Sequence, residues 1–236
     1  MSLLLIGIIT FCIDKINGNK LEEILNKIPL PSLRRLPRYL IVLEKLQRNG
    51  RTTVSATDVA EELDLKPIQI RKDMAFTGIV GKPKVGYDIN ELISSIRTFI
   101  GWHDVTPCVL IGAGSLGKAL IGYEEFAERN LKIVAAFDIN PDKHGMKIYQ
   151  TPVYSNESIT YVIEKNNISM AIITVPAAAA QDVTNILIAA GISGIWNFSP
   201  TEIQVPPNVT VKRENLSEGL AVLFVKMRER QIQLME

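Results

Sequence analysis

A glycine-rich loop and an acidic residue downstream of it have the clearest potential for chemistry in this chain. The loop, Gly112-Ala113-Gly114-Ser115-Leu116-Gly117, directly follows the apolar run 107–111. In such a loop the first glycine allows a tight turn, the second lets a pyrophosphate approach the backbone, and the third lets a helix pack close to the strand. Phosphate oxygens would then lie at a helix N-terminus, where free N–H groups favour negative charge.

Asp138 is the acidic residue. It ends the apolar run 133–137 and lies 21 residues after Gly117. A carboxylate at this spacing accepts hydrogen bonds from ribose hydroxyls and repels a 2′-phosphate, so NAD(H) is favoured over NADP(H). A tight turn followed by a helix N-cap would explain the glycines alone, but not the strand, the helix and the acid together. The sequence therefore predicts NADH/NAD+ as the cofactor.

Two further segments follow predicted strands, at the sheet edge where ligands of parallel α/β folds bind. Val175-Pro176 closes the fourth strand and Asn197-Phe198 closes the fifth, although a proline can also simply end a strand. No set of histidine, cysteine or Ser-Tyr-Lys accompanies them, so we expect a nucleotide-binding protein that is not an enzyme, with no catalytic residue and no metal ligand. The predicted cofactor-binding residues are Gly112, Ala113, Gly114, Ser115, Leu116, Gly117, Asp138, Ile139, Val175, Pro176, Asn197 and Phe198.

Basic residues are concentrated in the N-terminal part of the chain. The net charge is only +1, but between residues 31 and 86 eleven Lys and Arg stand against six Asp and Glu. The same stretch predicts two short helices joined by a turn at Asp64-Leu65, with Pro67 opening the second. Residues 81–87 then form a predicted basic hairpin. The pattern is that of a winged helix-turn-helix, a module that binds double-stranded DNA.

Six side chains of this block are predicted to contact DNA. Arginine can pair bidentately with guanine in the major groove, and lysine can contact phosphates. Any one of these charges is more commonly a solvated surface residue, but their clustering on a helix-turn-helix favours DNA binding. The residues are Arg35, Gln69, Arg71, Lys72, Lys82 and Lys84.

The order of the elements predicts an α/β chain. Strands and helices alternate after residue 107, which is typical of a Rossmann-type parallel sheet with crossover helices. The last helix is apolar on more than one side, so we expect a partner subunit to bury it. The predicted parts are an N-terminal extension (1–30), a winged-helix DNA-binding domain (31–89), a linker helix (90–106), a Rossmann NAD(H)-binding domain (107–215) and a swapped C-terminal dimerisation helix (216–236).

The composition of the chain limits the class of protein and its cellular location. Hydrophobic residues make up 47% of the chain and charged residues 22%, as in ordinary globular proteins. The apolar run from Leu3 to Ile13 is too short for a transmembrane helix, which needs about 20 residues, so no membrane attachment is expected. The two cysteines have no partner at metal-ligand or disulfide-framework spacing, which favours a reducing, cytoplasmic location.

Taken together, these motifs resemble the Rex family of redox-sensing transcriptional repressors over roughly residues 31–227. The resemblance is carried by the runs at 69–73, 85–88, 112–117, 134–138, 175–177 and 197–198. It implies a homodimer that binds operator DNA, with NADH lowering the DNA affinity and NAD+ competing with NADH. It further implies that Arg71 and Lys72 contact the DNA, and that Tyr123 lies near the cofactor and helps couple redox state to dimer closure.

The chain departs from the family pattern at several positions. Pro83 replaces an arginine of the wing, Ile41 an arginine of the first helix, and Ser217 an aspartate before the last helix. Two alternatives therefore stay open beside the repressor. One is an NAD-dependent oxidoreductase or CoA-binding enzyme subunit, and the other is a DNA-binding paralogue with weakened redox control.

Overall fold

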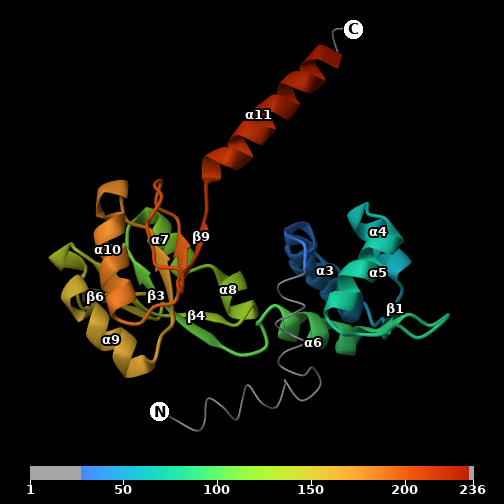
Figure 1. Cartoon of the computed structure of the whole chain (residues 1–236), viewed down its shortest axis with the longest axis horizontal. Coiled ribbons are helices and arrows are strands. Elements are labelled where there is room, and N and C mark those ends of the chain that lie inside the picture. The colour runs from blue at the N-terminus through green and yellow to red at the C-terminus, as the bar shows by residue number, and fades with distance from the viewer. Residues whose placement is uncertain (1–27, 234–236) are drawn as a thin grey trace. The chain divides into compact units, whose positions relative to one another are not determined.

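The computed structural model describes residues 28–233. The chain folds into two compact units, and the boundary between them lies between Asp104 and Val105 (Figure 1). The predicted N-terminal extension lies almost entirely outside the described residues. The first unit contains α3 (Leu30–Arg48), β1 (Thr53–Val54), α4 (Ala56–Leu63), α5 (Pro67–Phe76), β2 (Tyr87–Asp88) and α6 (Ile89–Phe99).

The helix-turn-helix of the first unit forms where the sequence predicts it. Ser55 caps α4 through a reciprocal capping box with Asp58. The turn that follows takes Asp64 into the left-handed region, and Pro67 opens α5 in its first turn, where a missing N–H is harmless. α5 turns Ile70 and Met74 inward, and both are fully buried.

α6 occupies most of the stretch predicted as a linker between domains. Its residues Ile89, Leu92 and Ile96 are fully buried in the same core as the apolar face of α3. Asp88 caps its N-terminus by accepting a hydrogen bond from the backbone N–H of Glu91 at 3.0 Å. The structure thus places α6 within the first unit, because its apolar face completes the core of that unit.

A buried ion pair joins α5 to α3. The Arg35 guanidinium donates to both carboxylate oxygens of Asp73, at 2.7 and 2.9 Å, and the Tyr39 hydroxyl donates to the same carboxylate at 2.5 Å. The Asp73 side chain is 2% exposed. Burial by itself raises the pKa of the Asp73 carboxyl, but hydrogen bonds from Arg35, Tyr39 and Ser32 outweigh it and hold the pKa below its usual value.

The second unit is a seven-stranded sheet in the order β5-β6-β4-β3-β7-β8-β9. All neighbours are parallel except β5 and β6. The chain builds outward from β3 in one direction and then returns to build from β7 in the other, so the topological switch point lies between these two strands. The elements, short 3-10 turns aside, are β3 (Thr106–Ile111), α7 (Ser115–Ile121), α8 (Glu124–Glu128), β4 (Leu131–Asp138), β5 (Lys147–Ile148), β6 (Thr151–Ser155), α9 (Ile159–Asn166), β7 (Met170–Ile173), α10 (Ala177–Ala189), β8 (Gly194–Asn197), β9 (Thr210–Arg213) and α11 (Leu216–Gln233).

Helices cover both faces of this sheet. Val109 and Ile111 of β3 lie in the cluster that includes residues of α9 and α10, whereas Cys108 and Leu110 lie in the cluster with α7 and α8. This alternation is the two-residue period of a strand whose faces are both buried. Cys108 is fully buried, and burial raises the pKa of its thiol to about 12.

The chain between β3 and β4 forms two short helices. α7 ends at Ile121 and α8 starts at Glu124, with Tyr123 in an extended conformation between them. Gly122 marks the break, since a Cβ at that position would overlap the ring of Tyr149. The sequence pattern alone did not reveal this contact, because Tyr149 comes from a distant part of the chain.

α11 follows β9 and leads away from the sheet (Figure 1). Every side chain described in it, from 217 to 233, is exposed. Apolar side chains are among them, and Leu223, Phe224 and Val225 are each more than half exposed. A helix with this much bare apolar surface gains stability from burial against another surface.

Replacing Asp73 with asparagine should destabilise the first unit by about 3 kcal/mol at neutral pH, because it leaves the Arg35 charge without its partner. The pKa of Asp73 is depressed in the folded state, so its contribution is present above the unfolded value of 3.8 and is lost as the pH falls through the folded value. Urea unfolding at several pH values should therefore show the gap between wild type and Asp73→Asn closing only below about pH 4.

Glu62→Gln is the matched control, since Glu62 forms an exposed ion pair with Lys45 at 2.8 Å. Its cost should stay within about 0.5 kcal/mol. An Asp73→Asn gap as small as this control at neutral pH would contradict the structural role of the buried pair.

Candidate functional site

The turn from β3 into α7 is shaped by its glycines. Gly112 has φ +102°, a left-handed conformation suited to glycine, and its N–H donates to the Phe137 carbonyl at 2.8 Å. A Cβ on Gly117 would overlap the carbonyl oxygen of Gly112, so the helix can pack this close only with glycine there. Gly114, in contrast, has no atom within 4 Å of the position where a Cβ would lie. The loop is thus tightly packed on its inner side and open at Gly114.

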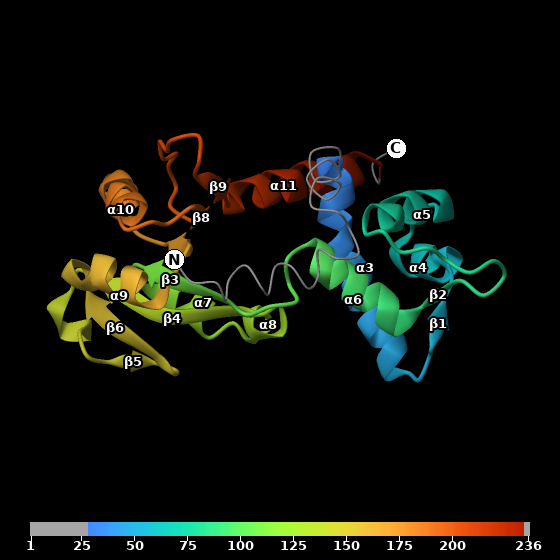
Figure 2. The same cartoon turned by 60° about the horizontal axis from the view of Figure 1, so that its bottom comes forward.

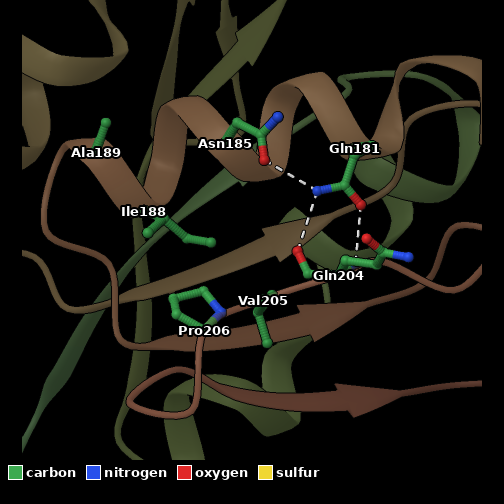
Figure 3. Close-up of a pocket in the computed structure, with 7 residues that line it drawn as sticks. All are labelled: Gln181, Asn185, Ile188, Ala189, Gln204, Val205 and Pro206. Atoms are coloured by element: carbon green, nitrogen blue, oxygen red, sulfur yellow. Dashed lines mark hydrogen bonds between the residues drawn. The ribbon is translucent and has the colours of Figure 1, made fainter.

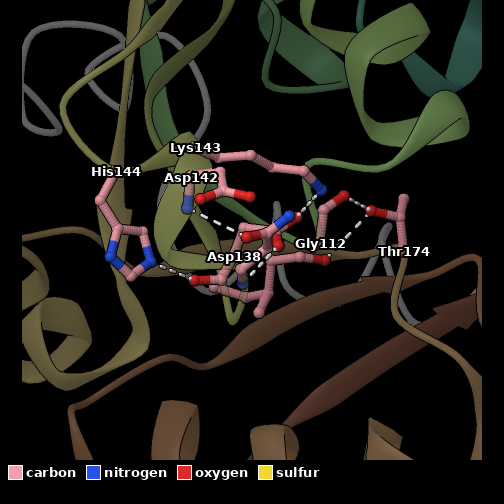
Figure 4. A network of polar contacts seen from close by, with 8 residues as sticks. Gly112, Asp138, Asp142, Lys143, His144 and Thr174 are labelled. Atoms are coloured by element: carbon pink, nitrogen blue, oxygen red, sulfur yellow. Dashed lines mark hydrogen bonds and ion pairs between the residues drawn. The ribbon is translucent and has the colours of Figure 1, made fainter.

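Thr174 ties this turn to the neighbouring strand. Its hydroxyl lies 2.7 Å from the Gly112 carbonyl oxygen and 3.0 Å from that of Ile111 (Figure 4). The residue follows β7 directly, on the other side of the switch point. Sequence analysis missed Thr174. The available signal was a hydroxyl residue at the carboxyl end of a buried strand, just before Val175-Pro176.

Asp138 lies at the carboxyl end of β4, where the sequence predicts it. Its carboxylate accepts from the Asn140 N–H at 2.9 Å and pairs with Lys143 at 2.7 Å (Figure 4). Burial raises the pKa of the Asp138 carboxyl, but the contacts with Lys143 and the Asn140 and Ala113 N–H groups outweigh it, so the pKa lies below its usual value. Asp138 is therefore an ionised acceptor at neutral pH, and Lys143 is a second polar residue at this end that sequence analysis did not predict.

At the carboxyl ends of β7 and β8, the structure gives one predicted residue an internal role. The fully buried Asn197 accepts from the Ser199 N–H and donates to the Thr201 carbonyl, both at 2.9 Å, so its amide holds the loop after β8. The Ser199 hydroxyl donates to the Val175 carbonyl and joins this loop to the end of β7. Of the other predicted residues, Pro176 is exposed at the start of α10, and Ile139, beyond β4, is 85% exposed.

Tyr123 lies between α7 and α8, and its side chain is about half exposed. Its hydroxyl donates to the Glu125 carboxylate, which raises the pKa of the tyrosine. Its ring meets that of Phe126 edge to face, with centroids 5.0 Å apart. Phe126 in turn contacts Trp196 of β8, so Tyr123 is connected by aromatic contacts to the carboxyl end of that strand.

In the first unit, Arg71 and Lys72 point away from the core on α5, and both are exposed. The predicted DNA contact Arg35 is instead engaged in the ion pair with Asp73, with 15% of its side chain exposed. The side-chain amide of Gln69 faces the Arg35 guanidinium at 3.0 Å. Arg35 therefore positions α5, and the basic side chains left free to meet another molecule on this helix are Arg71 and Lys72.

The wing is a short hairpin that reaches out beyond α4 and α5 (Figures 1 and 2). Lys82 and Gly86 exchange both backbone hydrogen bonds, at 2.7 and 2.9 Å, around a turn that contains Pro83 and Lys84. Lys84 has φ +62°, in the left-handed region where a non-glycine residue is strained by about 1–2 kcal/mol. The turn therefore holds two exposed lysine side chains, Lys82 and Lys84, on a fixed backbone.

A groove of about 590 Å³ lies beside α10, away from the glycine loop (Figure 3). The Gln181 amide crosses it, donating to the Gln204 carbonyl and to Asn185 and accepting from the Gln204 N–H. These hydrogen bonds fix the loop after β8 to α10, so the polar groups of the groove already serve the fold.

The described residues contain neither a metal-binding cluster nor a membrane-spanning helix. Among residues 28–233, no cluster of three or more His, Cys, Asp or Glu side chains could hold a metal ion. Within the same residues, no helix combines the length and the apolar character required to cross a bilayer.

Comparison with known proteins gives matches for both units. The family model described as "CoA binding domain" matches residues 103–201, and the model described as "Putative DNA-binding protein N-terminus" matches residues 27–75. Among solved structures, RSP, a Rex-family repressor, in complex with β-NAD+ and operator DNA superposes with a TM-score of 0.81 and 31% identity, covering 88% of this chain and 96% of that one. RSP in complex with β-NADH gives a TM-score of 0.78 at the same identity, covering 89% and 98%.

Curated relatives match over most of their length. The redox-sensing transcriptional repressor Rex of Treponema denticola is 46% identical over 202 residues, which cover 85% of this chain and 96% of the relative. The Rex repressor of Carboxydothermus hydrogenoformans is 41% identical, covering 86% and 97%. These relatives are matched over nearly their whole length at more than 40% identity, and the chain belongs to the Rex family of redox-sensing transcriptional repressors.

Proposed function

We propose that this protein is a transcriptional repressor that binds operator DNA through its first unit and is released from it when NADH binds to the second. The observation that carries the proposal is the pairing of two sites in one chain. The open backbone at Gly114 and the ionised Asp138 suit a dinucleotide, while Arg71 and Lys72 form an exposed basic face on a helix-turn-helix. Solved relatives contain β-NADH, or β-NAD+ with operator DNA, and they support both halves of this proposal.

The cofactor would bind across the carboxyl edge of the sheet. Its pyrophosphate would lie on the backbone of loop 112–117, and its adenosine ribose would donate hydrogen bonds to Asp138. Its nicotinamide would lie toward Val175, Pro176 and Phe198, with Tyr123 near the cofactor. These side chains are aliphatic, aromatic or already hydrogen-bonded, and the His144 Nε2–H donates to the Asp138 carbonyl on the adenosine side. Among the described residues placed at this end there is no histidine, cysteine or Ser-Tyr-Lys set, so we propose a sensor and not an oxidoreductase or a CoA-binding enzyme subunit.

The repressor would act as a homodimer in the cytoplasm. The exposed apolar side chains of α11 favour burial against a partner subunit. Each subunit of a dimer would contribute one α5 helix. To bind an operator, the two helices must enter successive major grooves about 34–36 Å apart. NADH would lower DNA affinity by binding more tightly to a dimer arrangement that does not match this spacing.

A gel shift with a palindromic operator tests the proposed function. Saturating NADH should reduce operator affinity at least about fivefold, the lower end of typical coupling between two sites, and NAD+ should have a smaller effect. Equal operator binding with and without NADH would leave only the DNA-binding paralogue with weakened redox control.

Two glycine substitutions should separate cofactor binding from folding. Gly114→Ala places a methyl group in open space, so we expect an unchanged melting temperature and NADH affinity reduced about tenfold or more, since the pyrophosphate needs that space. Gly117→Ala drives a methyl group into the Gly112 carbonyl and should lower the melting temperature of the second unit. Calorimetry and NADH titration of both variants check this, and a Gly114→Ala protein with full NADH affinity would count against the proposed position of the pyrophosphate.

Lys84→Gly should weaken operator binding while it raises stability. The substitution removes a charge proposed to contact DNA and relieves left-handed strain of about 1 kcal/mol. Each lost phosphate contact also reduces the salt dependence of binding, so the slope of log affinity against log salt should fall by about 1.

Arg71→Ala is the companion variant on α5. It should lose operator affinity without a gain in stability and without loss of NADH affinity. A Lys84→Gly protein that binds operator as wild type at every salt concentration would show that the wing lysine does not touch DNA.

A further inference from the structure

Four aromatic rings form a continuous row in the second unit. The centroids of Tyr123 and Phe126 are 5.0 Å apart, those of Phe126 and Trp196 are 5.6 Å apart, and those of Trp196 and Phe198 are 5.0 Å apart. The row runs from the junction of α7 and α8 to the residue that follows β8. We place Phe198, at one end of the row, near the nicotinamide, and Tyr123, at the other end, near the cofactor.

Trp196 is the member of the row that also contacts the C-terminal segment. Its indole N–H donates to the carboxylate of Glu214 at 3.0 Å. The Glu214 backbone N–H donates to the Asn197 carbonyl at 2.8 Å, and Lys212 lies 3.3 Å from the same carboxylate oxygen. Glu214 is therefore held by a side-chain and a backbone contact to β8, with a lysine supporting its charge.

Glu214 stands two residues before the first residue of α11, Leu216. The side chains described in α11 are all exposed, and in the described residues this helix has no core of its own to fix its direction. Among the described residues, Glu214 is the last one before α11 whose side chain is hydrogen-bonded to a strand of the sheet. A small movement at Trp196 would consequently be passed to the base of α11.

We propose that the Trp196–Glu214 hydrogen bond couples the nicotinamide end of the cofactor site to the direction of α11, with both residues acting as positioning residues. The inference rests on the proposed function and names the route by which NADH would act. Cofactor binding next to Phe198 would displace the row of aromatic rings. Trp196 would transmit this displacement to Glu214 through their hydrogen bond, and the direction of α11 would change.

Three quantities test the proposal in the full-length protein: operator Kd without nucleotide, operator Kd with saturating NADH, and NADH Kd without DNA. The ratio of the first two measures the coupling. Trp196→Phe keeps an aromatic ring but removes the indole N–H, and Glu214→Ala removes the acceptor. Each should reduce the coupling ratio at least about fivefold, while NADH Kd stays within about threefold of wild type.

Two further variants exclude a general loss of structure. Glu214→Gln keeps a carbonyl oxygen that accepts from the indole, so it should retain the coupling ratio within about twofold. The double variant Trp196→Phe with Glu214→Ala should lose no more coupling than either single variant, because one shared interaction is removed in all three. Glu202→Ala is the matched control, since it removes an exposed ion pair to Arg213 in the same segment, at 3.2 Å, without touching Trp196.

The outcomes are distinct. A wild-type coupling ratio in both Trp196→Phe and Glu214→Ala overturns the proposal. A large loss of NADH affinity in Trp196→Phe also overturns it, because the indole would then belong to the cofactor pocket. A wild-type protein whose operator affinity ignores NADH refutes the proposed function itself, and this inference falls with it.

Discussion

The carbonyl oxygen of Gly112 occupies the space that any side chain at residue 117 would need, and the second unit is organised around this close approach. Because α7 can lie directly on the end of β3, the backbone N–H groups of loop 112–117 gather at the carboxyl edge of the sheet. Thr174 holds the same turn from the neighbouring strand, across the switch point where the chain reverses its direction of growth. Asp138, one strand further along, then lies at the same edge.

Both units pair a buried carboxylate with a cation, and the two pairs have different consequences. In the first unit, Asp73 takes up the Arg35 charge inside the fold, which fixes α5 and leaves its outer basic residues for another molecule. In the second, Lys143 lies against Asp138 at the surface of the sheet edge, so the carboxylate keeps acceptor positions for a ligand. The ion pair in the interior therefore fixes the position of a helix, whereas the ion pair at the sheet edge keeps the Asp138 carboxylate ionised at the proposed cofactor site.

The sequence predicted the local features well because they depend on neighbouring residues. The turn at Asp64-Leu65, the opening of α5 at Pro67 and the turn of loop 112–117 each follow from residue types a few positions apart. Long-range partners were not predicted. Only the fold shows that Asp73 binds a guanidinium 38 positions away. The break at Gly122 and the place of α6 in the first core depend on such tertiary contacts too.

Cys108 lies in β3, the strand that leads into the glycine loop, with no exposed surface and a thiol pKa raised to about 12 by burial. The reactive form of cysteine is the thiolate, and this one stays protonated and sealed from peroxide or glutathione. A buried, protonated thiol of this kind does not react with oxidants, so Cys108 adds no thiol switch to the proposed response to NADH. At this position in the second unit, a rise in oxidants would therefore leave the protein chemically unchanged.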